Sequence, residues 1–228
     1  MLGDFLMALH SLTHLELRVA CFLDTASWLP IVLPNLQFLK LDDDIAEALH
    51  TIRATRMVVL LLVPRSLVAE SVLAAVMNNQ FPALQHLIFR DFSHNDLDVL
   101  AQKFPSIERL TCKGDGFNVH TVLTTIPRGS SSSHVDDRSG PASHQLPWSR
   151  LNTIAVSSSV EALDAVALCD KIRILQDAGH PIRKLLLPPK QLARENADAL
   201  LGLRGLVETG NFSVDWPTPF VSDYRKRR

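Results

Sequence analysis

The residue types of a hydrolytic site gather in one polar stretch, residues 127–147, with the sequence PRGSSSSHVDDRSGPASHQLP. Ser130 to Ser133, His134 and Asp136 supply the side chains of a nucleophilic triad, in which a histidine takes the proton of an attacking hydroxyl. Catalysis needs these groups in a fixed mutual geometry. Pro, Gly, Ser and charged residues leave almost nothing to bury here, so we expect a disordered loop rather than a catalytic site. Phosphorylation of the serines is the more plausible chemistry for this stretch.

Two other groups have the residue types of cation sites. His10 and His14 are four positions apart, a spacing that binds metal when both lie on a helix. The apolar pattern over residues 12–17 predicts a strand at His14 instead, which breaks that geometry. The carboxylates of residues 42–44 could hold a cation, but they also favour the positive end of a helix predicted from residue 45. We therefore expect no metal, no cofactor and no catalytic residue.

Cysteine content and charge indicate a protein of the cytoplasm or the nucleus. Cys21, Cys112 and Cys169 are odd in number and far apart, which predicts reduced thiols. The net charge of -1 gives no general preference for nucleic acid or membrane surfaces. The longest fully apolar run, residues 57–63, is much shorter than the roughly 20 residues that cross a bilayer. Asp4 interrupts the first apolar stretch, so we expect no signal peptide.

A repeated apolar pattern must position any functional side chain. Residues 81–89, FPALQHLIF, return 23 positions later (104 − 81) as residues 104–112, FPSIERLTC. An L-x-x-L-x-L pattern begins at seven positions: Leu12, Leu36, Met57, Leu84, Ile107, Leu151 and Ile182. A strand and a helix that recur every 20–29 residues with this spacing are typical of leucine-rich repeats. The sixth pattern begins 44 positions after the fifth (151 − 107), and subtracting the 21 residues of 127–147 leaves 23, so we interpret that stretch as an insertion.

The segments between these strands predict helices. Their expected ranges are 45–54, 67–78, 94–103, 119–125, 160–178 and 190–203. Asp44, Ser93 and Ser158 each precede an acidic residue by three positions, as the first residue of a helix often does, and Asn118 is the expected start of 119–125. Alternation over residues 211–216 suits a final strand. The prediction is an α/β leucine-rich-repeat solenoid over residues 1–216, with a curved parallel sheet on one face and helices on the other, and a basic tail over residues 217–228.

These features resemble a known family. The segments LPNLQFLKL, FPALQHLIF and FPSIERLTC, the irregular repeat lengths and the Ser-rich insertion resemble the C-terminal region of fungal F-box proteins with degenerate leucine-rich repeats, over about residues 12–216. The resemblance implies the substrate-recognition part of a ubiquitin ligase receptor, whose F-box docks onto the adaptor of a cullin-RING ligase. No F-box is recognisable before residue 12, so ligase components would be reached through a module that is missing from this sequence.

Strand register gives the side chains that point away from the helices. The first column is His14, Phe38, Val59, His86, Arg109, Thr153 and Lys184. The second column is Glu16, Lys40, Leu61, Ile88, Thr111, Ala155 and Leu186. The third column is Arg18, Asp42, Val63, Arg90, Lys113, Ser157 and Pro188.

An apolar patch with a charged rim is predicted within these columns. Its apolar members are Phe38, Val59, Leu61 and Ile88, and its rim is Lys40, Arg90 and Arg109. Exposed apolar patches of this kind are typical of protein-binding surfaces. Packing or a loop could instead cover the patch, or the register predicted for the third strand could be wrong. Full burial of Leu61 and Ile88 would exclude the patch.

The function predicted from these patterns is a non-catalytic scaffold for protein–protein interaction. The expected partner-binding residues are Phe38, Lys40, Val59, Leu61, His86, Ile88, Arg90 and Arg109. A regulator or inhibitor of an enzyme is the alternative from another class. A nucleic-acid-binding repeat protein is a third, supported only by the cations on one face: Arg18, Arg90, Arg109, Lys113 and Lys184.

Overall fold

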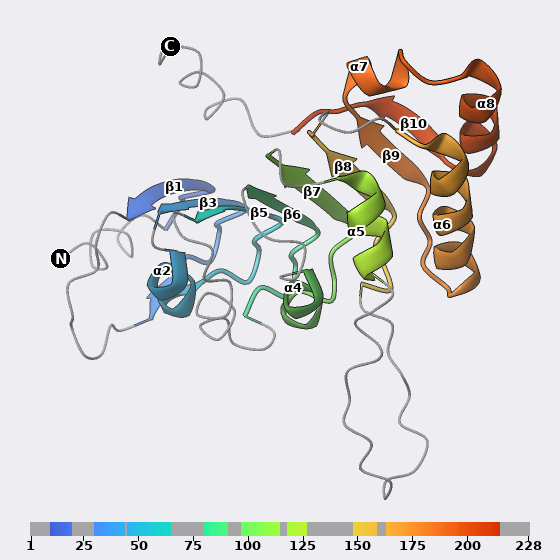
Figure 1. Cartoon of the computed structure of the whole chain (residues 1–228). Coiled ribbons are helices and arrows are strands. Elements are labelled where there is room, and N and C mark those ends of the chain that lie inside the picture. The colour runs from blue at the N-terminus through green and yellow to red at the C-terminus, as the bar shows by residue number, and fades with distance from the viewer. Residues whose placement is uncertain are drawn as a thin grey trace, which may run out of the picture.

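In the computed structural model of the chain, one parallel sheet organises the fold (Figure 1). The structure describes residues 10–19, 30–43, 45–64, 80–90, 97–114, 118–126, 148–158 and 163–214. Its eight strands follow one another across the sheet in chain order: β1 (His14–Val19), β3 (Phe38–Asp43), β5 (Val59–Pro64), β6 (His86–Arg90), β7 (Arg109–Lys113), β8 (Thr153–Val156), β9 (Lys184–Leu187) and β10 (Glu208–Asn211). Every pair of neighbours runs parallel, so the predicted α/β class is confirmed.

The predicted strand register is confirmed across seven strands. His14 lies beside Phe38, and the same row continues through Val59, His86, Arg109, Thr153 and Lys184. Each of these residues stands two positions after the first apolar residue of its L-x-x-L-x-L pattern. Because successive side chains of a strand point to opposite faces, this register sends the other two apolar residues of each pattern to the opposite side of the sheet.

Main-chain hydrogen bonds fix this register before each strand begins. The amides of Val58 and Val59 both donate to the carbonyl of Gln37, at 2.8 and 3.0 Å. One unit later, the amides of Gln85 and His86 both donate to the carbonyl of Val58 at 3.0 Å. The same two-amide pattern recurs ahead of β3, β7, β8 and β9. Each unit is thereby aligned on the carbonyl that precedes the previous strand.

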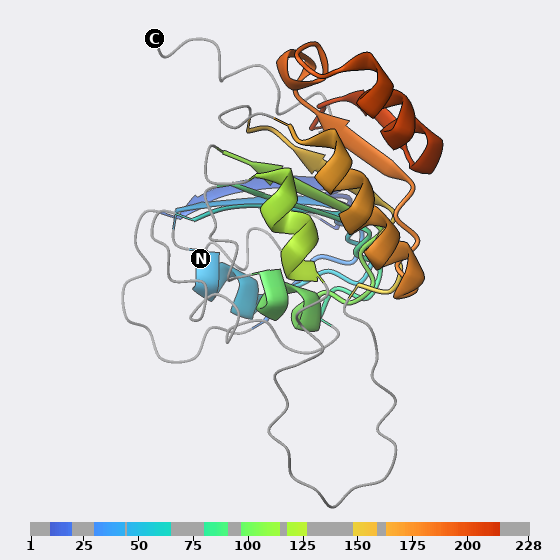
Figure 2. The ribbon, with the colours of Figure 1, turned by 45° about the vertical axis from the view of Figure 1, so that its right-hand side comes forward.

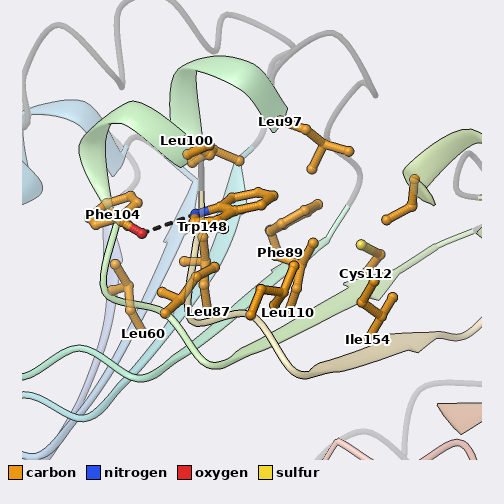
Figure 3. Close-up of a cluster of buried hydrophobic side chains, with 14 of the residues drawn as sticks. Leu60, Leu87, Phe89, Leu97, Leu100, Phe104, Leu110, Cys112, Trp148 and Ile154 are labelled. Atoms are coloured by element: carbon orange, nitrogen blue, oxygen red, sulfur yellow. Dashed lines mark hydrogen bonds between the residues drawn. The ribbon is translucent and has the colours of Figure 1, made fainter. Parts of the chain in front are cut away.

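The apolar residues of the repeated pattern form the core. Leu60, Leu87 and Leu110 hold the same position on β5, β6 and β7, and all three are fully buried. Figure 3 shows these leucines under Trp148, whose indole Nε1 donates to the carbonyl of Phe104 at 3.0 Å. Burying a large apolar side chain contributes about 1.5–3 kcal/mol. The burial of the repeated leucines therefore stabilises the fold substantially.

Helices cover this apolar side of the sheet (Figures 1 and 2). They are α2 (Ile45–Thr51), α4 (Leu97–Lys103), α5 (Val119–Thr125), α6 (Ala165–Asp177) and α8 (Ala197–Leu206). The single turn α7 (Pro189–Leu192) follows the end of β9 and has no buried residue. The helix predicted over 119–125 is confirmed with its first-turn cap, since Asn118 Oδ1 accepts from the amide of His120 at 2.8 Å. A second, two-stranded parallel sheet, β2 (Ile31–Val32) with β4 (Ile52–Arg53), was not predicted because its strands are too short to show a period.

Three predicted boundaries are wrong near the C-terminus. The helix expected over 160–178 has Asp164, rather than Ser158, as its capping residue, because Asp164 Oδ1 accepts from the amide of Ala167 at 2.9 Å. The helix expected over 190–203 is two helices, since Asn196 accepts from the amide of Asp198 and starts α8. The final strand is Glu208–Asn211 rather than 211–216, because its ladder follows the register of β9.

Several predicted features lie outside the described residues. They are the helix over 67–78, the insertion 127–147, the basic tail 217–228, Cys21 and the proposed caps Asp44 and Ser93. In the part of the chain that the structure covers, no helix combines the length and the apolar character needed to span a bilayer.

Candidate functional site

The side of the sheet opposite the helices carries the three predicted columns, and we call it the helix-free face. Its residues alternate along each strand with the core leucines, as between Phe38 and Leu39 in β3. Neighbouring strands of a sheet lie about 4.8 Å apart, so each column forms a continuous row of side chains. The side chains of this face point away from the leucine core and form a broad surface.

Three contacts join β1 and β3 at one end of the helix-free face. The rings of His14 and Phe38 stack with their centroids 4.3 Å apart and their planes 14° from parallel. Lys40, only 4% exposed, forms an ion pair with the carboxylate of Glu16. Two residues further along β1, Arg18 Nε lies 2.8 Å from a carboxylate oxygen of Asp43. Charges of both signs therefore meet at this end of the face.

These contacts bear on the two candidate cation sites. His14 lies on a strand and stacks on Phe38, as the apolar pattern predicted, so the helical geometry needed with His10 does not arise. Asp43 has a left-handed backbone, with φ 72°, and pairs with Arg18 rather than standing open beside Asp42. Across the described ranges, no cluster of three or more His, Cys, Asp or Glu residues is arranged to hold a metal ion.

The centre of the helix-free face is more buried than predicted. Ile88 is fully buried, Val59 is 6% exposed, and the ring of His86 is also buried, with its Nε2 2.9 Å from Thr111 Oγ1. The predicted patch is therefore wrong as a contiguous exposed surface. The physical reason is lateral packing: on adjacent parallel strands, side chains in equivalent positions lie close enough to cover one another.

The residues that remain accessible form the border of the original patch. Phe38, Leu61, Arg90 and Arg109 are each half-buried, so each offers part of its side chain to a partner. Lys40, Val59, His86 and Ile88 are buried and support this surface from within. Because Leu61 is not fully covered, a reduced apolar surface persists around it.

No protein-family model and no curated protein matches the chain. The assignment of a role to the helix-free face therefore depends on its own geometry.

The cations of the face are largely engaged with acceptors from the chain itself. Lys184 Nζ lies 2.6 Å from a carboxylate oxygen of Glu208 on the next strand. Arg18 pairs with Asp43, and Arg109 Nη2 donates to the main-chain carbonyl of Ser213 at 2.9 Å. A phosphate backbone would have to compete with these contacts, which weakens the case for nucleic-acid binding.

The contact between Arg109 and Ser213 was missed by the sequence reading. The two residues are 104 positions apart (213 − 109), and the bond goes to a main-chain carbonyl that carries no sequence signal. Phe212 still belongs to the ladder, since its amide donates to the carbonyl of Leu187 at 2.8 Å. The residues after β10 thus reach a side chain of β7.

The two cysteines within the described residues are unsuited to nucleophilic chemistry. Cys112 and Cys169 are both buried and neither forms a disulfide. Burial raises the pKa of the Cys112 thiol far above its usual value, so the thiolate does not form at physiological pH. Cys112 holds the third apolar position of its repeat and serves as a core residue.

Proposed function

We propose that the chain is a leucine-rich-repeat solenoid that binds a protein partner on its helix-free face and has no catalytic role of its own. The observation that carries this proposal is the unbroken row from His14 to Lys184, in which seven strands present equivalent positions on the side opposite the helices. Repeat proteins characteristically use such extended faces to bind partners.

The contact region that we propose is centred on Phe38 and Leu61 and flanked by Arg90 and Arg109. These residues are half-buried and therefore partly accessible. Partly buried aromatic, aliphatic and arginine side chains are the types that contribute most to protein interfaces. An enzyme regulated by this chain would use the same surface, with the enzyme as the partner.

We further propose that the chain is the substrate-recognition part of an F-box-type ubiquitin ligase receptor, acting in the cytoplasm or the nucleus. The support is the resemblance of its repeat segments to that family and the reduced state of its two described cysteines. In this role the helix-free face holds the substrate, and a module outside these residues contacts the ligase adaptor.

Affinity capture from cells that express the chain, read by mass spectrometry, tests both proposals. Leu61→Arg places a charge on the helix-free face, and Ile174→Arg is the matched control because Ile174 is 59% exposed on α6. We expect a protein that the wild type and Ile174→Arg both retain and that Leu61→Arg loses at least tenfold. The same dependence must hold with the purified partner, and circular dichroism must show both variants folded.

The outcomes separate the proposals. Recovery of a ligase adaptor together with the partner supports the ligase role. Because the module that contacts the adaptor lies outside these residues, a face-dependent partner without any ligase component supports the scaffold and does not decide the ligase role. The scaffold proposal would be contradicted if Leu61→Arg left the binding of every captured partner unchanged. It would also be contradicted if the chain bound mixed oligonucleotides in a salt-dependent manner and bound no protein.

A further inference from the structure

The chain places a short piece of itself on the helix-free face. Residues 212–214 follow β10 and are half-buried. The amide of Phe212 donates to the carbonyl of Leu187 and extends the strand ladder. The carbonyl of the next residue, Ser213, accepts a hydrogen bond from Arg109 Nη2 at 2.9 Å. Arg109 lies three strands from β10 in the order β7-β8-β9-β10. Three strand spacings amount to about 14 Å, so the segment and the arginine side chain together bridge that width.

The side of the sheet on which this contact lies follows from the register. Arg109 belongs to the first column, between His86 and Thr153, and its neighbour Leu110 points into the core. The guanidinium is therefore on the helix-free face, and Ser213 approaches it from that side.

The chemistry of the contact favours recognition of a main chain. Arg109 donates to a peptide carbonyl, which every residue type carries. A guanidinium presents several N–H donors in a fixed plane, so it suits an extended backbone that runs past it. A segment of another protein could make the same bond in place of Ser213.

We propose that the helix-free face around Arg109 is a binding site for an extended peptide segment of the protein partner, and that Phe212–Val214 occupies this site in the free chain. This inference rests on the proposed function, because it names the kind of partner and its regulation. The internal segment competes at an effective concentration in the millimolar range, as short tethers do. A partner therefore binds fully only when it displaces this segment.

A fluorescent synthetic peptide with the sequence of residues 208–216, ETGNFSVDW, serves as the probe. It is titrated by fluorescence anisotropy into the full-length wild type and into a full-length variant with Phe212→Gly, Ser213→Gly and Val214→Gly. Arg109→Ala is then added to the triple variant. The matched control is Arg173→Ala, because Arg173 is 58% exposed and lies on α6, away from the helix-free face.

We expect the triple variant to bind the peptide at least tenfold more tightly than the wild type does. Arg109→Ala should then lower that affinity at least tenfold, while Arg173→Ala should leave it unchanged. Equal binding by the wild type and the triple variant, indifference to Arg109→Ala, or no binding by the triple variant up to about 1 mM peptide would overturn the proposal.

A second measurement does not depend on the triple variant folding. Chymotryptic cleavage of the Phe212–Ser213 bond, followed by mass spectrometry, should be at least tenfold faster in Arg109→Ala than in the wild type, and unchanged in Arg173→Ala. Equal cleavage rates would contradict the internal contact. If a captured partner depends on Leu61 but is not displaced by the peptide, this inference fails while the scaffold proposal stands. If peptide binding depends on Arg109 but no captured protein depends on the helix-free face, the peptide site stands and the scaffold proposal fails.

Discussion

Trp148 is fully buried in the core and is the first described residue after Ile126. It stands three positions before Leu151, the place that Phe81 holds before Leu84 and Phe104 before Ile107. The backbone of Trp148 is left-handed, with φ 52°. The amide of Leu151 donates to the carbonyl of Trp148 at 2.9 Å, which closes a turn before β8. A buried aromatic residue thus stands at the same position before β8 as before β6 and β7.

Substitutions of Trp148 should separate its packing from its hydrogen bond. Trp148→Ala should lower the free energy of unfolding by about 3–5 kcal/mol because it empties a fully buried site. Trp148→Phe keeps most of the volume but leaves the Phe104 carbonyl without the indole donor, which should cost about 1–3 kcal/mol. Urea unfolding measures both. Equal losses for the two variants would show that the indole N–H, rather than the ring volume, dominates.

The buried ring of His180 should make stability depend on pH. Burial lowers the pKa of His180, and the main chain of Trp148 opposes this shift only in part. Among the described residues, neither ring nitrogen has a partner in hydrogen-bonding geometry. The folded chain therefore binds the proton less readily than the unfolded chain does. The free energy of unfolding should fall as the pH falls below about 6.5, until the lowered pKa is reached.

The measurement compares urea unfolding of the wild type and His180→Leu at pH 7.5 and pH 5.5. Other titrating groups act on both proteins, so their contributions cancel in the comparison. The wild type should lose more stability than His180→Leu on going to the lower pH. A larger loss in His180→Leu would mean that the protonated ring is stabilised in the folded chain.

At the scale of elements, side chains from outside a helix hold its C-terminal end. Gln80, 7% exposed, donates through Nε2 to the carbonyls of Leu49 and Ile52, the latter at 2.6 Å. Arg53 Nη1 donates to the carbonyl of His50 at 2.7 Å. These carbonyls belong to the last turn of α2 and to β4, where no helical partner remains for them.

Gln80→Leu should therefore lower the free energy of unfolding by about 1–3 kcal/mol, because buried carbonyls lose a donor. Gln80→Glu should cost at least as much, since a carboxylate faces the negative end of the helix. Urea unfolding followed by circular dichroism measures the effect. Gln37→Leu is the matched control on an exposed glutamine, and a loss as large as that of Gln80→Leu there would contradict the capping role.

The strands could be predicted from the sequence, while several helix boundaries could not. The L-x-x-L-x-L period predicts one strand per pattern. Because the leucines must be buried in the core, they also fix the register of each strand with its neighbour. Helix boundaries depend on single local bonds instead. Asp164 and Asn196 each start a helix because one side-chain oxygen reaches one amide, and nearby residues such as Ser158 offer the same chemistry.

The candidate site was only partly predictable for a similar reason. The columns follow from register, so the row through Phe38, His86 and Arg109 is correct. Exposure depends on what lies beside each residue in space, so Ile88 is covered although its position faces away from the core. The contact of Ser213 with Arg109 uses a main-chain carbonyl and leaves no pattern in the sequence.

At the scale of the whole molecule, each strand depends on its immediate neighbours. Strand β6 pairs with β5 and β7, whereas β1 pairs only with β3 and β10 only with β9 among the described strands. In such a linear arrangement, stability is a sum of unit and nearest-neighbour contributions. Units with two neighbours should therefore open less often than units with one.

Hydrogen exchange should follow this order. Amides of residues 86–90 and 109–113 should exchange about tenfold or more slowly than those of residues 14–19 and 208–211, because local opening costs least at the ends. Leu110→Ala should reduce protection most in β6, β7 and β8 and least in β1, since Leu110 is fully buried at the centre. Leu201→Ala is the control because Leu201 is 63% exposed on α8. Mass spectrometry of peptic fragments measures each segment, and a uniform loss across all strands in Leu110→Ala would mean that the sheet unfolds as one cooperative unit.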